Sequence, residues 1–552
     1  MLKHSRLFFF LSFSLLLTVC SYGQLGQSKN KFTEQDTLRG SNGPGRQWWD
    51  IQHYAIEVKP DITAQTISGK VTIRFKRTKT PYHYMQIDLQ EPMILDKAIY
   101  NGKALKFSRN KNVYLLEWPA ADKKPSDKIE LYYHGVPRKA ANAPWDGGWV
   151  WQKDKLGRPW ITVACQGLGA SVWYPCKDYQ GDEPDNGAAL SITVPDSLVA
   201  VGNGNLQGVT TPAKGLKKYV WVVESPINNY NIIPYIGKYA NWTDSYTGEE
   251  GKLDCSYWVL DYNVEASKKQ FGRDVARMMK CFEHWFGPYP FYKDSYKMVE
   301  THHLGMEHQS AVAYGNQYKD GYLGMDLSRS GWGMKWDYII IHETGHEWFA
   351  NNITTEDIAD MWIHEGFTTY SEVLFVECEY GKQAADEYCQ GLRRGIANRS
   401  PVIGPYGVNE EGSGDMYPKG ANLLHTIRQV IGNDETFRQI LRGLNKDFYH
   451  GITTSAKVEQ YFTEKSGKDL SKIFDQYLRQ SSIPVLEYKA EGTSIAYRWA
   501  SCVPGFNMPV KVKAGDTEHT LQPTEQWQQL PAREGDTFSV DKNYYIQIKK
   551  AA

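Results

Sequence analysis

The sequence predicts a multidomain α+β protein in which an all-β region, a helical region and a smaller β region follow one another. A chain of 552 residues is too long for a single hydrophobic core, so several domains are expected. The period of the apolar pattern changes twice along the chain, from alternation to helical spacing and back again. These changes place an all-β domain at 46–240, a largely helical domain at 241–482 and a C-terminal β domain at 483–552.

The N-terminal region is predicted to consist of short strands. Val71, Ile73 and Phe75 alternate with polar residues, which is the period of a strand with one buried face. Runs of the same kind recur between turns rich in Gly, Pro and Asn. They lie at 128–133, 190–194 and 219–223.

Helical spacing begins after this region. The apolar residues that follow it are Phe271, Val275, Met278, Phe282 and Trp285. Gly287 and Pro288 come directly after them and predict the end of the helix. Further helical patterns continue to about residue 480, and strand-like alternation resumes after Pro484.

The N-terminus has the pattern of a secretory signal peptide, which we assign to residues 1–23. Two basic residues precede an apolar run from Leu7 to Val19, and small residues follow it. This run is too short to span a bilayer, and no later stretch is long enough, so we expect no transmembrane segment. Export to the periplasm or the extracellular space is expected. Soluble export is favoured over a lipid anchor at Cys20, because Val19 is a poor residue for lipoprotein processing.

A polar, glycine-rich stretch at 24–45 is expected to be a loose leader. Lys plus Arg and Asp plus Glu both number 63, and this balance argues against nucleic acid as a partner. The 8 cysteines are scattered and do not resemble a disulfide framework. Cys165 and Cys176 either form a pair or remain buried free thiols, and free thiols are slightly favoured.

The strongest chemical signal is an H-E-x-x-H pattern formed by His342, Glu343 and His346. Two histidines four residues apart project from the same face of a helix and can ligate one zinc ion. A glutamate beside the first histidine is placed to act as a general base toward a water on the metal.

Glu365 is predicted to be the third ligand of this single zinc ion. It lies between Trp362 and Phe367, so a solvated position is disfavoured, and a buried carboxylate needs a partner. Two histidines and a glutamate form a typical catalytic zinc site, in which the fourth position stays open.

The run from His342 to Tyr370 resembles the zinc-binding segment of the gluzincin aminopeptidases, the family typified by aminopeptidase N and the bifunctional leukotriene hydrolase. The resemblance covers nearly all of the chain after residue 45. It implies an N-terminal β-saddle domain, a thermolysin-like α/β catalytic domain and a small C-terminal β-sandwich. We expect the large helical C-terminal domain of many relatives to be missing, and therefore a more open active site that admits longer peptides.

Two further segments resemble motifs of this family. Gly305, Met306 and Glu307 match its G-x-M-E-N exopeptidase motif, whose glutamate binds the free α-amino group of the substrate. His308 replaces the asparagine, which puts the backbone contacts of that asparagine in doubt. Tyr417 matches the Y-x-K-G motif, which implies that its neutral phenol donates a hydrogen bond to the oxyanion.

Two more residues are assigned through the resemblance or through their spacing. Gln166 lies in a segment that resembles the part of the family that also contacts the substrate amine. Glu372 is either a hydrogen-bond partner of a zinc histidine or a surface glutamate.

The resemblance implies a zinc metallo-aminopeptidase, a hydrolase that removes the N-terminal residue of peptides with a free N-terminus. One alternative is a thermolysin-type zinc endopeptidase, although such an enzyme has no use for Glu307. Another is an epoxide hydrolase, which is weakened because Asn409 lies where the leukotriene enzyme has an aspartate. A non-catalytic peptide-binding homologue is disfavoured, since all the expected catalytic residue types are present.

Overall fold

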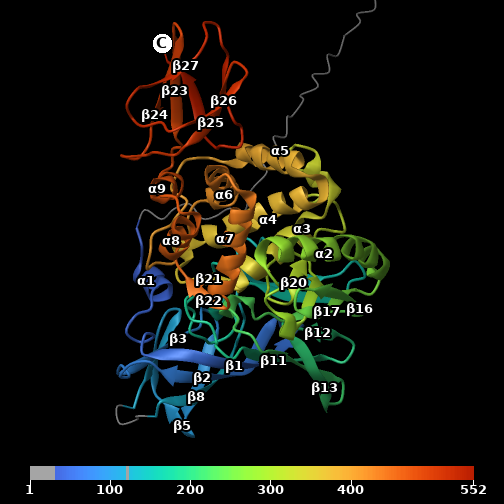
Figure 1. Ribbon diagram of the computed structural model, residues 1–552. Helices are drawn as coiled ribbons and strands as arrows, with labels where there is room; N and C mark the ends of the chain where they lie inside the picture. The colour runs from blue at the N-terminus through green and yellow to red at the C-terminus, as the bar shows by residue number, and fades with distance from the viewer. Residues whose placement is uncertain (1–30, 120–123, 552) are drawn as a thin grey trace, which may run out of the picture.

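The computed structural model describes residues 31–119 and 124–551. A β domain at the N-terminus, a helical domain and a C-terminal β domain follow one another along the long axis of the molecule (Figure 1). This confirms the predicted multidomain α+β architecture. The signal peptide predicted at 1–23, including Cys20, lies outside the described residues.

The N-terminal domain is built on an 8-stranded sheet with the strand order β13-β14-β11-β1-β2-β8-β4-β5. The predicted strand pattern is confirmed in β2, where Val71, Ile73 and Phe75 are buried. The strands of this sheet are β1 (Trp49–Asp61), β2 (Thr66–Arg77), β4 (Ile94–Tyr100), β5 (Lys103–Leu105), β8 (Ser126–Gly135), β11 (Ala188–Pro195), β13 (Asn205–Ala213) and β14 (Leu216–Val223).

Two smaller sheets complete this domain and lead the chain toward the functional site. Strand β10 ends directly before Cys165 and Gln166, and the short helix η2 carries Tyr230. The elements are β3 (Tyr84–Asp88), β6 (Phe107–Asn110), β7 (Val113–Glu117), β9 (Gly148–Lys153), β10 (Pro159–Ala164), β12 (Val199–Val201) and β15 (Tyr235–Gly237), with η1 (Ala170–Val172) and η2 (Asn229–Asn231).

The expected loose leader differs from the structure, because residues from Thr33 onward are folded. Helix α1 (Glu34–Gly40) is capped by the Thr33 side chain. Behind it, the fully buried Arg46 forms a 2.5 Å ion pair with Asp88 and donates to the carbonyl of Arg39 at 2.9 Å. A buried ion pair with added hydrogen bonds holds the segment in place, which the polar composition did not indicate.

The helical domain contains a 5-stranded sheet, with the order β16-β17-β18-β20-β19, covered by helices. Helix α2 ends before Gly287 as predicted. The strands are β16 (Tyr239–Gly248), β17 (Gly251–Leu260), β18 (Tyr296–Glu300), β19 (Gly305–Met306) and β20 (Val312–Tyr314), with the pair β21 (Ile353–Thr355) and β22 (Gly451–Thr453). The α-helices are α2 (Val264–Phe286), α3 (Tyr338–Gly345), α4 (Trp362–Tyr380), α5 (Lys382–Leu392), α6 (Pro418–Ile431), α7 (Asp434–Asp447), α8 (Ser455–Ser466) and α9 (Ser471–Arg479). Short helical turns are η3 (Tyr292–Asp294), η4 (Trp332–Lys335), η5 (Glu347–Asn351), η6 (Ile358–Asp360), η7 (Arg393–Gly395) and η8 (Gly414–Met416).

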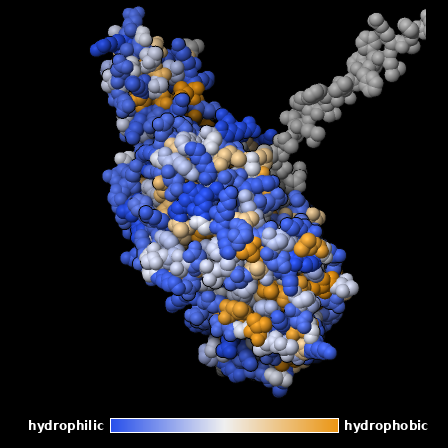
Figure 2. Space-filling model, turned by 90° about the vertical axis from the view of Figure 1, so that its right-hand side faces the viewer, coloured by the Kyte–Doolittle hydropathy of each residue, from blue (hydrophilic) through white to orange (hydrophobic). Residues whose placement is uncertain are grey.

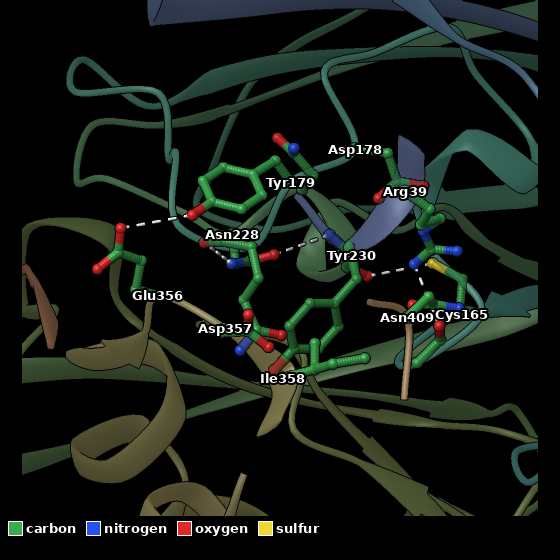
Figure 3. Close-up of a pocket in the computed structure, with 15 residues that line it drawn as sticks. Arg39, Cys165, Asp178, Tyr179, Asn228, Tyr230, Glu356, Asp357, Ile358 and Asn409 are labelled. Atoms are coloured by element: carbon green, nitrogen blue, oxygen red, sulfur yellow. Dashed lines mark hydrogen bonds and ion pairs between the residues drawn. The ribbon is translucent and has the colours of Figure 1, made fainter. Parts of the chain in front are cut away.

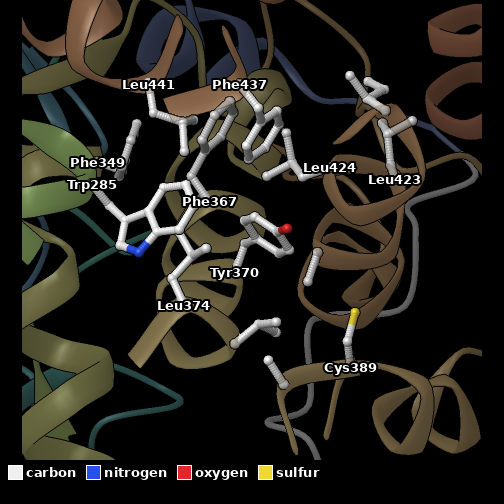
Figure 4. Close-up of a cluster of buried hydrophobic side chains, with 14 of the residues drawn as sticks. Trp285, Phe349, Phe367, Tyr370, Leu374, Cys389, Leu423, Leu424, Phe437 and Leu441 are labelled. Atoms are coloured by element: carbon white, nitrogen blue, oxygen red, sulfur yellow. The ribbon is translucent and has the colours of Figure 1, made fainter. Parts of the chain in front are cut away.

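Helix α4 runs through the middle of this domain and is buried along most of its length. Figure 4 shows Phe367, Tyr370 and Leu374 of α4 in a cluster with Leu424 of α6 and Phe437 of α7. Close packing of this kind leaves a helix little freedom to shift. The core therefore sets the position of the carboxylates that α4 carries.

A disulfide bond between Cys281 and Cys378 joins α2 to α4, with 6.1 Å between the Cα atoms. The sequence analysis missed this bond, because the two residues are 97 positions apart and only the tertiary fold brings them together. Cys165 and Cys176 are both buried free thiols in the described structure. The pairing considered for them does not form.

The C-terminal domain packs two small sheets and forms a narrow lobe that projects from the main body (Figure 2). Tyr477 of α9 ties it to the helical domain by donating a 2.6 Å hydrogen bond to the carbonyl of Tyr545. Its strands are β23 (Val485–Glu491), β24 (Ser494–Ala500), β25 (Val510–Ala514), β26 (Thr517–Leu521), β27 (Gln528–Pro531), β28 (Phe538–Val540) and β29 (Gln547–Lys550).

Across residues 31–119 and 124–551, no helix combines the length and the apolar character needed to cross a membrane.

Candidate zinc centre and amine-binding site

Helix α3 presents His342 and His346 on one face, as the four-residue spacing predicts. The helix begins at Asp337, whose carboxylate accepts a hydrogen bond from the backbone N–H of Ile339. It lies against α4 at Gly345, where an added Cβ atom would be 2.5 Å from Oγ of Ser371. The glycine therefore allows the close helix approach that brings the histidines to α4.

The donor atoms of His342, His346 and Glu365 all lie within 4.8 Å of one another. Oε2 of Glu365 is 3.7 Å from Nε2 of His342 and 3.4 Å from Nε2 of His346, too far for good hydrogen bonds. This buried oxygen has no hydrogen-bond partner among the described residues. An orphaned carboxylate oxygen facing two imidazole nitrogens fits a zinc ion, whose preferred ligands are of these types.

The Nδ1 atom of His342 is engaged by Glu372, at 2.6 Å from Oε1. The other carboxylate oxygen of Glu372 accepts a 2.6 Å hydrogen bond from the Tyr388 hydroxyl. Glu372 is only 1% exposed, which excludes a position on the surface. Because Nδ1 donates to this carboxylate, Nε2 of His342 carries the lone pair that a metal needs.

The Nδ1 atom of His346 is held by a kink in the chain that the sequence analysis missed. The backbone leaves helical geometry at Phe349 (ψ 86°) and Ala350 (φ 146°). The carbonyl of Phe349 consequently lies 3.1 Å from Nδ1 of His346, and Thr368 Oγ1 lies at 3.0 Å. Both contacts direct Nε2 of His346 toward Glu365. No local sequence pattern signals this kink.

Glu343, the predicted general base, lies next to Glu307 in a second group of facing donor atoms. One donor atom each of Glu307, Glu343 and His346 lies within 4.8 Å of the others. An added Cβ atom on Gly305 would be 2.7 Å from Oε1 of Glu343, so the glycine leaves room for this carboxylate. Met306, beside it in β19, is buried. Burial raises the pKa of Glu343 to about 7, a value suited to taking up and returning a proton near neutral pH.

Glu307, the predicted amine ligand, is 2% exposed. Its Oε1 atom accepts hydrogen bonds from Nε2 of Gln166 at 2.5 Å and from the hydroxyl of Tyr230 at 2.9 Å. Burial raises the pKa of this carboxyl above its ordinary value, and a cationic partner would oppose that shift. The sequence analysis named Gln166 but not Tyr230, because a lone tyrosine in a β-rich domain carries no specific signal.

His308, which stands in place of the family asparagine, is fully buried and lies 2.5 Å from the Tyr235 hydroxyl through Nδ1. Asn351 stabilises the backbone directly before His308 by donating a 2.8 Å hydrogen bond to the carbonyl of Glu307. Neither His303, which is buried, nor His302, whose ring meets that of Trp160 edge-on, belongs to the group of metal-donor atoms.

Tyr417, the predicted oxyanion donor, directly precedes α6. Its ring centroid is 6.3 Å from that of His342. This position depends on Gly420 and Gly366, at which α6 and α4 approach so closely that a Cβ atom on Gly420 would be 2.8 Å from Cα of Gly366. Burial and the neighbouring Glu365 raise the pKa of Tyr417 well above its usual value, so the phenol keeps its proton.

The fold brings together a donor set that fits a zinc ion and, beside it, the buried carboxylate of Glu307. Residues 273–477 match the family described as the peptidase family M1 domain. The matched residues include His342, Glu343, His346, Glu365 and Tyr417, which lie in the segments that resemble the gluzincin aminopeptidases.

Named relatives are similar to part of the chain. The chain is 23% identical over 473 residues to an alanine/arginine aminopeptidase of Saccharomyces cerevisiae, an alignment that covers 81% of this chain and 54% of that protein. It is 26% identical over 335 residues to aminopeptidase M1 of Arabidopsis thaliana, covering 57% of this chain and 36% of the relative. The chain therefore spans about half or less of these relatives.

The fold is shared with a shorter protein. A crystal structure of an M1 zinc metallopeptidase mutant from Deinococcus radiodurans, bound to a Tyr-Ser-Ala substrate, matches with a TM-score of 0.67 and 20% identity. The match covers 80% of this chain and 96% of that one.

Proposed function

We propose that the chain is a zinc-dependent aminopeptidase that removes the first residue of peptides with a free N-terminus. The observation that carries the proposal is the position of Glu307. Its carboxylate is buried, is held by Gln166 and Tyr230, and has an oxygen within 4.8 Å of donor atoms of Glu343 and His346. A carboxylate there pairs with an ammonium group one residue away from the reacting carbonyl.

Each group of the site has a distinct task in this reaction. His342, His346 and Glu365 would hold the zinc ion, which supplies Lewis-acid polarisation and lowers the pKa of a water molecule. Glu343 accepts the proton of the attacking water and delivers it to the leaving amine. The Tyr417 hydroxyl donates a hydrogen bond to the oxyanion that develops on the carbonyl.

A thermolysin-type endopeptidase is the second candidate, since it would use the same metal ligands. The buried carboxylate of Glu307 disfavours it, because an internal peptide bond offers no ammonium group to neutralise that charge. A non-catalytic peptide-binding role is disfavoured too, because it would need neither a proton acceptor such as Glu343 nor an oxyanion donor such as Tyr417.

The test compares hydrolysis of Ala, Leu, Arg and Glu fluorogenic amides with hydrolysis of the same amides after N-acetylation. We expect cleavage of the free amines alone, and its loss on treatment with a zinc chelator. Glu343→Gln is expected to abolish turnover while zinc, measured by elemental analysis, stays bound. Equal cleavage of the acetylated substrates would establish an endopeptidase, and no cleavage by the zinc-loaded protein would support a binding role.

We further propose that the protein is exported and soluble, in the periplasm or outside the cell. The disulfide between Cys281 and Cys378 supports this, because such bonds persist in oxidising compartments. The N-terminal pattern of residues 1–23 is the second support. Cell fractionation with N-terminal sequencing tests the proposal. A mature chain that begins at a lipid-modified Cys20 would contradict soluble export.

A further inference from the structure

The loop between Gly407 and Gly412 carries a carboxylate, Glu411, to which the proposed reaction gives no task. This carboxylate lies beside Gly167, since a Cβ atom added to Gly167 would be only 2.6 Å from Oε1 of Glu411. Gly167 directly follows Gln166, which is hydrogen-bonded to Glu307. The carboxylate of Glu411 therefore borders the place where the N-terminal residue of a substrate binds.

The loop is held from three directions. Its N-terminal end is fixed by the backbone N–H of Gly407, which donates a 2.7 Å hydrogen bond to Asp357. The backbone N–H of Asn409 donates to the carbonyl of Asp36 in α1 at 2.9 Å. At the other end, a Cβ atom on Gly412 would be 1.7 Å from the carbonyl oxygen of Val402. The position of Glu411 is thus set by packing.

The nearest arginine already has other partners. Arg39 of α1 lies beside Cys165 and Asn409 in a small cavity next to the loop (Figure 3). Its guanidinium group is 3.4 Å from the carboxylate of Asp178 and donates to the carbonyl of Gly167 at 3.1 Å. Within the described ranges, the Glu411 carboxylate itself makes no hydrogen bond or ion pair.

The charges of the site compensate Glu411 only in part, because Arg39, which lowers the pKa of this carboxyl, also pairs with Asp178. A zinc ion would balance the carboxylates of Glu365 and Glu343, and the α-ammonium group of a substrate would balance Glu307. Burial, together with the carboxylates of Glu365, Glu410 and Glu307, raises the pKa of Glu411 to about 7. A cation placed at this carboxylate would relieve that repulsion.

We propose that Glu411 selects peptides whose first residue is arginine or lysine, by pairing with the cationic end of that side chain. The inference rests on the proposed aminopeptidase function and names a preference within it. Gly167 has φ +67° and no side chain, and an added Cβ atom there would meet the Glu411 carboxylate. A guanidinium group suits the site best, because it can bind both carboxylate oxygens at once.

One alternative use of Glu411 is as a second anchor for the α-ammonium group. The two roles differ in their substrate dependence. An amine anchor acts on every free peptide, whereas a side-chain partner acts on arginine and lysine alone. Kinetics on matched substrates therefore separate the two roles.

The test measures kcat/KM for Arg, Lys, Leu and Ala fluorogenic amides, and for the citrulline amide, a neutral analogue of the arginine substrate. The zinc-loaded wild-type protein is expected to prefer Arg over citrulline. We expect Glu411→Gln to lower kcat/KM for Arg and Lys by about 10- to 100-fold, the range for a charged hydrogen bond. The values for Leu, Ala and citrulline should change less than about twofold.

Glu410→Gln is the matched control, since it removes the same charge from the adjacent position, and it should leave the Arg to citrulline ratio nearly unchanged. An equal loss on all five substrates in Glu411→Gln would overturn the proposal in favour of an amine anchor. An unchanged kcat/KM for Arg and Lys in Glu411→Gln would also overturn the proposal. Equal cleavage of the Arg and citrulline amides by the wild-type protein would overturn it as well, and this measurement does not depend on the folding of a variant. If the wild-type protein cleaves none of the amides, the aminopeptidase function fails instead.

Discussion

The side-chain amide of Gln166 donates a 2.5 Å hydrogen bond to Oε1 of Glu307 and thereby joins the N-terminal domain to the carboxylate beside the metal centre. The hydroxyl of Tyr230, from the same domain, bonds the same oxygen. With one oxygen held from that side, the second is left to receive an ammonium group. The N-terminal domain therefore contributes side chains to the candidate site.

Gln166→Ala and Tyr230→Phe are each expected to raise KM for free-amine substrates about 10-fold, because a hydrogen bond to a charged group is lost. Zinc content should not change in either variant. Steady-state kinetics together with elemental analysis check this. An unchanged KM in both variants would show that Glu307 does not bind the substrate amine through the oxygen opposite these two donors.

Glu372→Ala is expected to weaken zinc binding by about 10- to 100-fold, since it removes the partner of His342 Nδ1. Chelator competition measures the affinity. Glu379→Gln is the control on the same helix, because Glu379 is exposed and pairs with Arg277 away from the site. Equal zinc affinity in the two variants would exclude a role of Glu372 in orienting the ligand.

Gly420→Ala is expected to destabilise the protein by about 1–3 kcal/mol, because the new methyl group would meet the backbone of Gly366. Since α6 begins directly after Tyr417, turnover should fall as well. The control is Gly272→Ala in α2, where nothing lies within 4 Å of the added Cβ atom. That substitution is expected to stabilise the helix by up to about 1 kcal/mol. Urea denaturation compares the two, and a neutral Gly420→Ala would contradict the tight crossing.

Removal of the disulfide through the double substitution Cys281→Ser and Cys378→Ser is expected to lower the free energy of unfolding by about 2–5 kcal/mol. This is the range for disulfides that close long loops. Denaturation with and without reductant measures the cost, because reduction of the wild-type protein should reproduce the variant. Cys502→Ser, at a half-buried free thiol, should have little effect. A wild-type stability that does not respond to reductant would mean that the bond does not form in solution.

The candidate zinc ligands could be predicted from the sequence because the relation of His342 to His346 is set by local helix geometry. Their common face follows from the 3.6-residue period alone. Glu365 followed from its apolar neighbours, which indicated burial. The strand regions and the end of α2 were likewise local in origin, set by residue period and by Gly287.

The partners of these residues could not be found in this way. Tyr230 is 77 positions from Glu307 and reaches it only through the contact between two domains. The kink that aims the carbonyl of Phe349 at His346 depends on tertiary packing, since Ala350 adopts a φ of 146° that its residue type does not favour. The folding of α1 was also hidden, because Arg46, which donates to the carbonyl of Arg39 in α1, is held by the distant Asp88.

The sequence by itself determined the kinds of chemical groups that this protein brings to a reaction, together with the α+β order of its domains. Both follow from short-range patterns, because the helix and strand periods determine which side chains lie on the same face. Only the tertiary structure decided which groups face one another. Examples are the approach of Glu411 to Gly167 and the hydrogen bond from Gln166 to Glu307. Those contacts join segments far apart in the chain, and they form only when the burial of apolar surface brings the segments together.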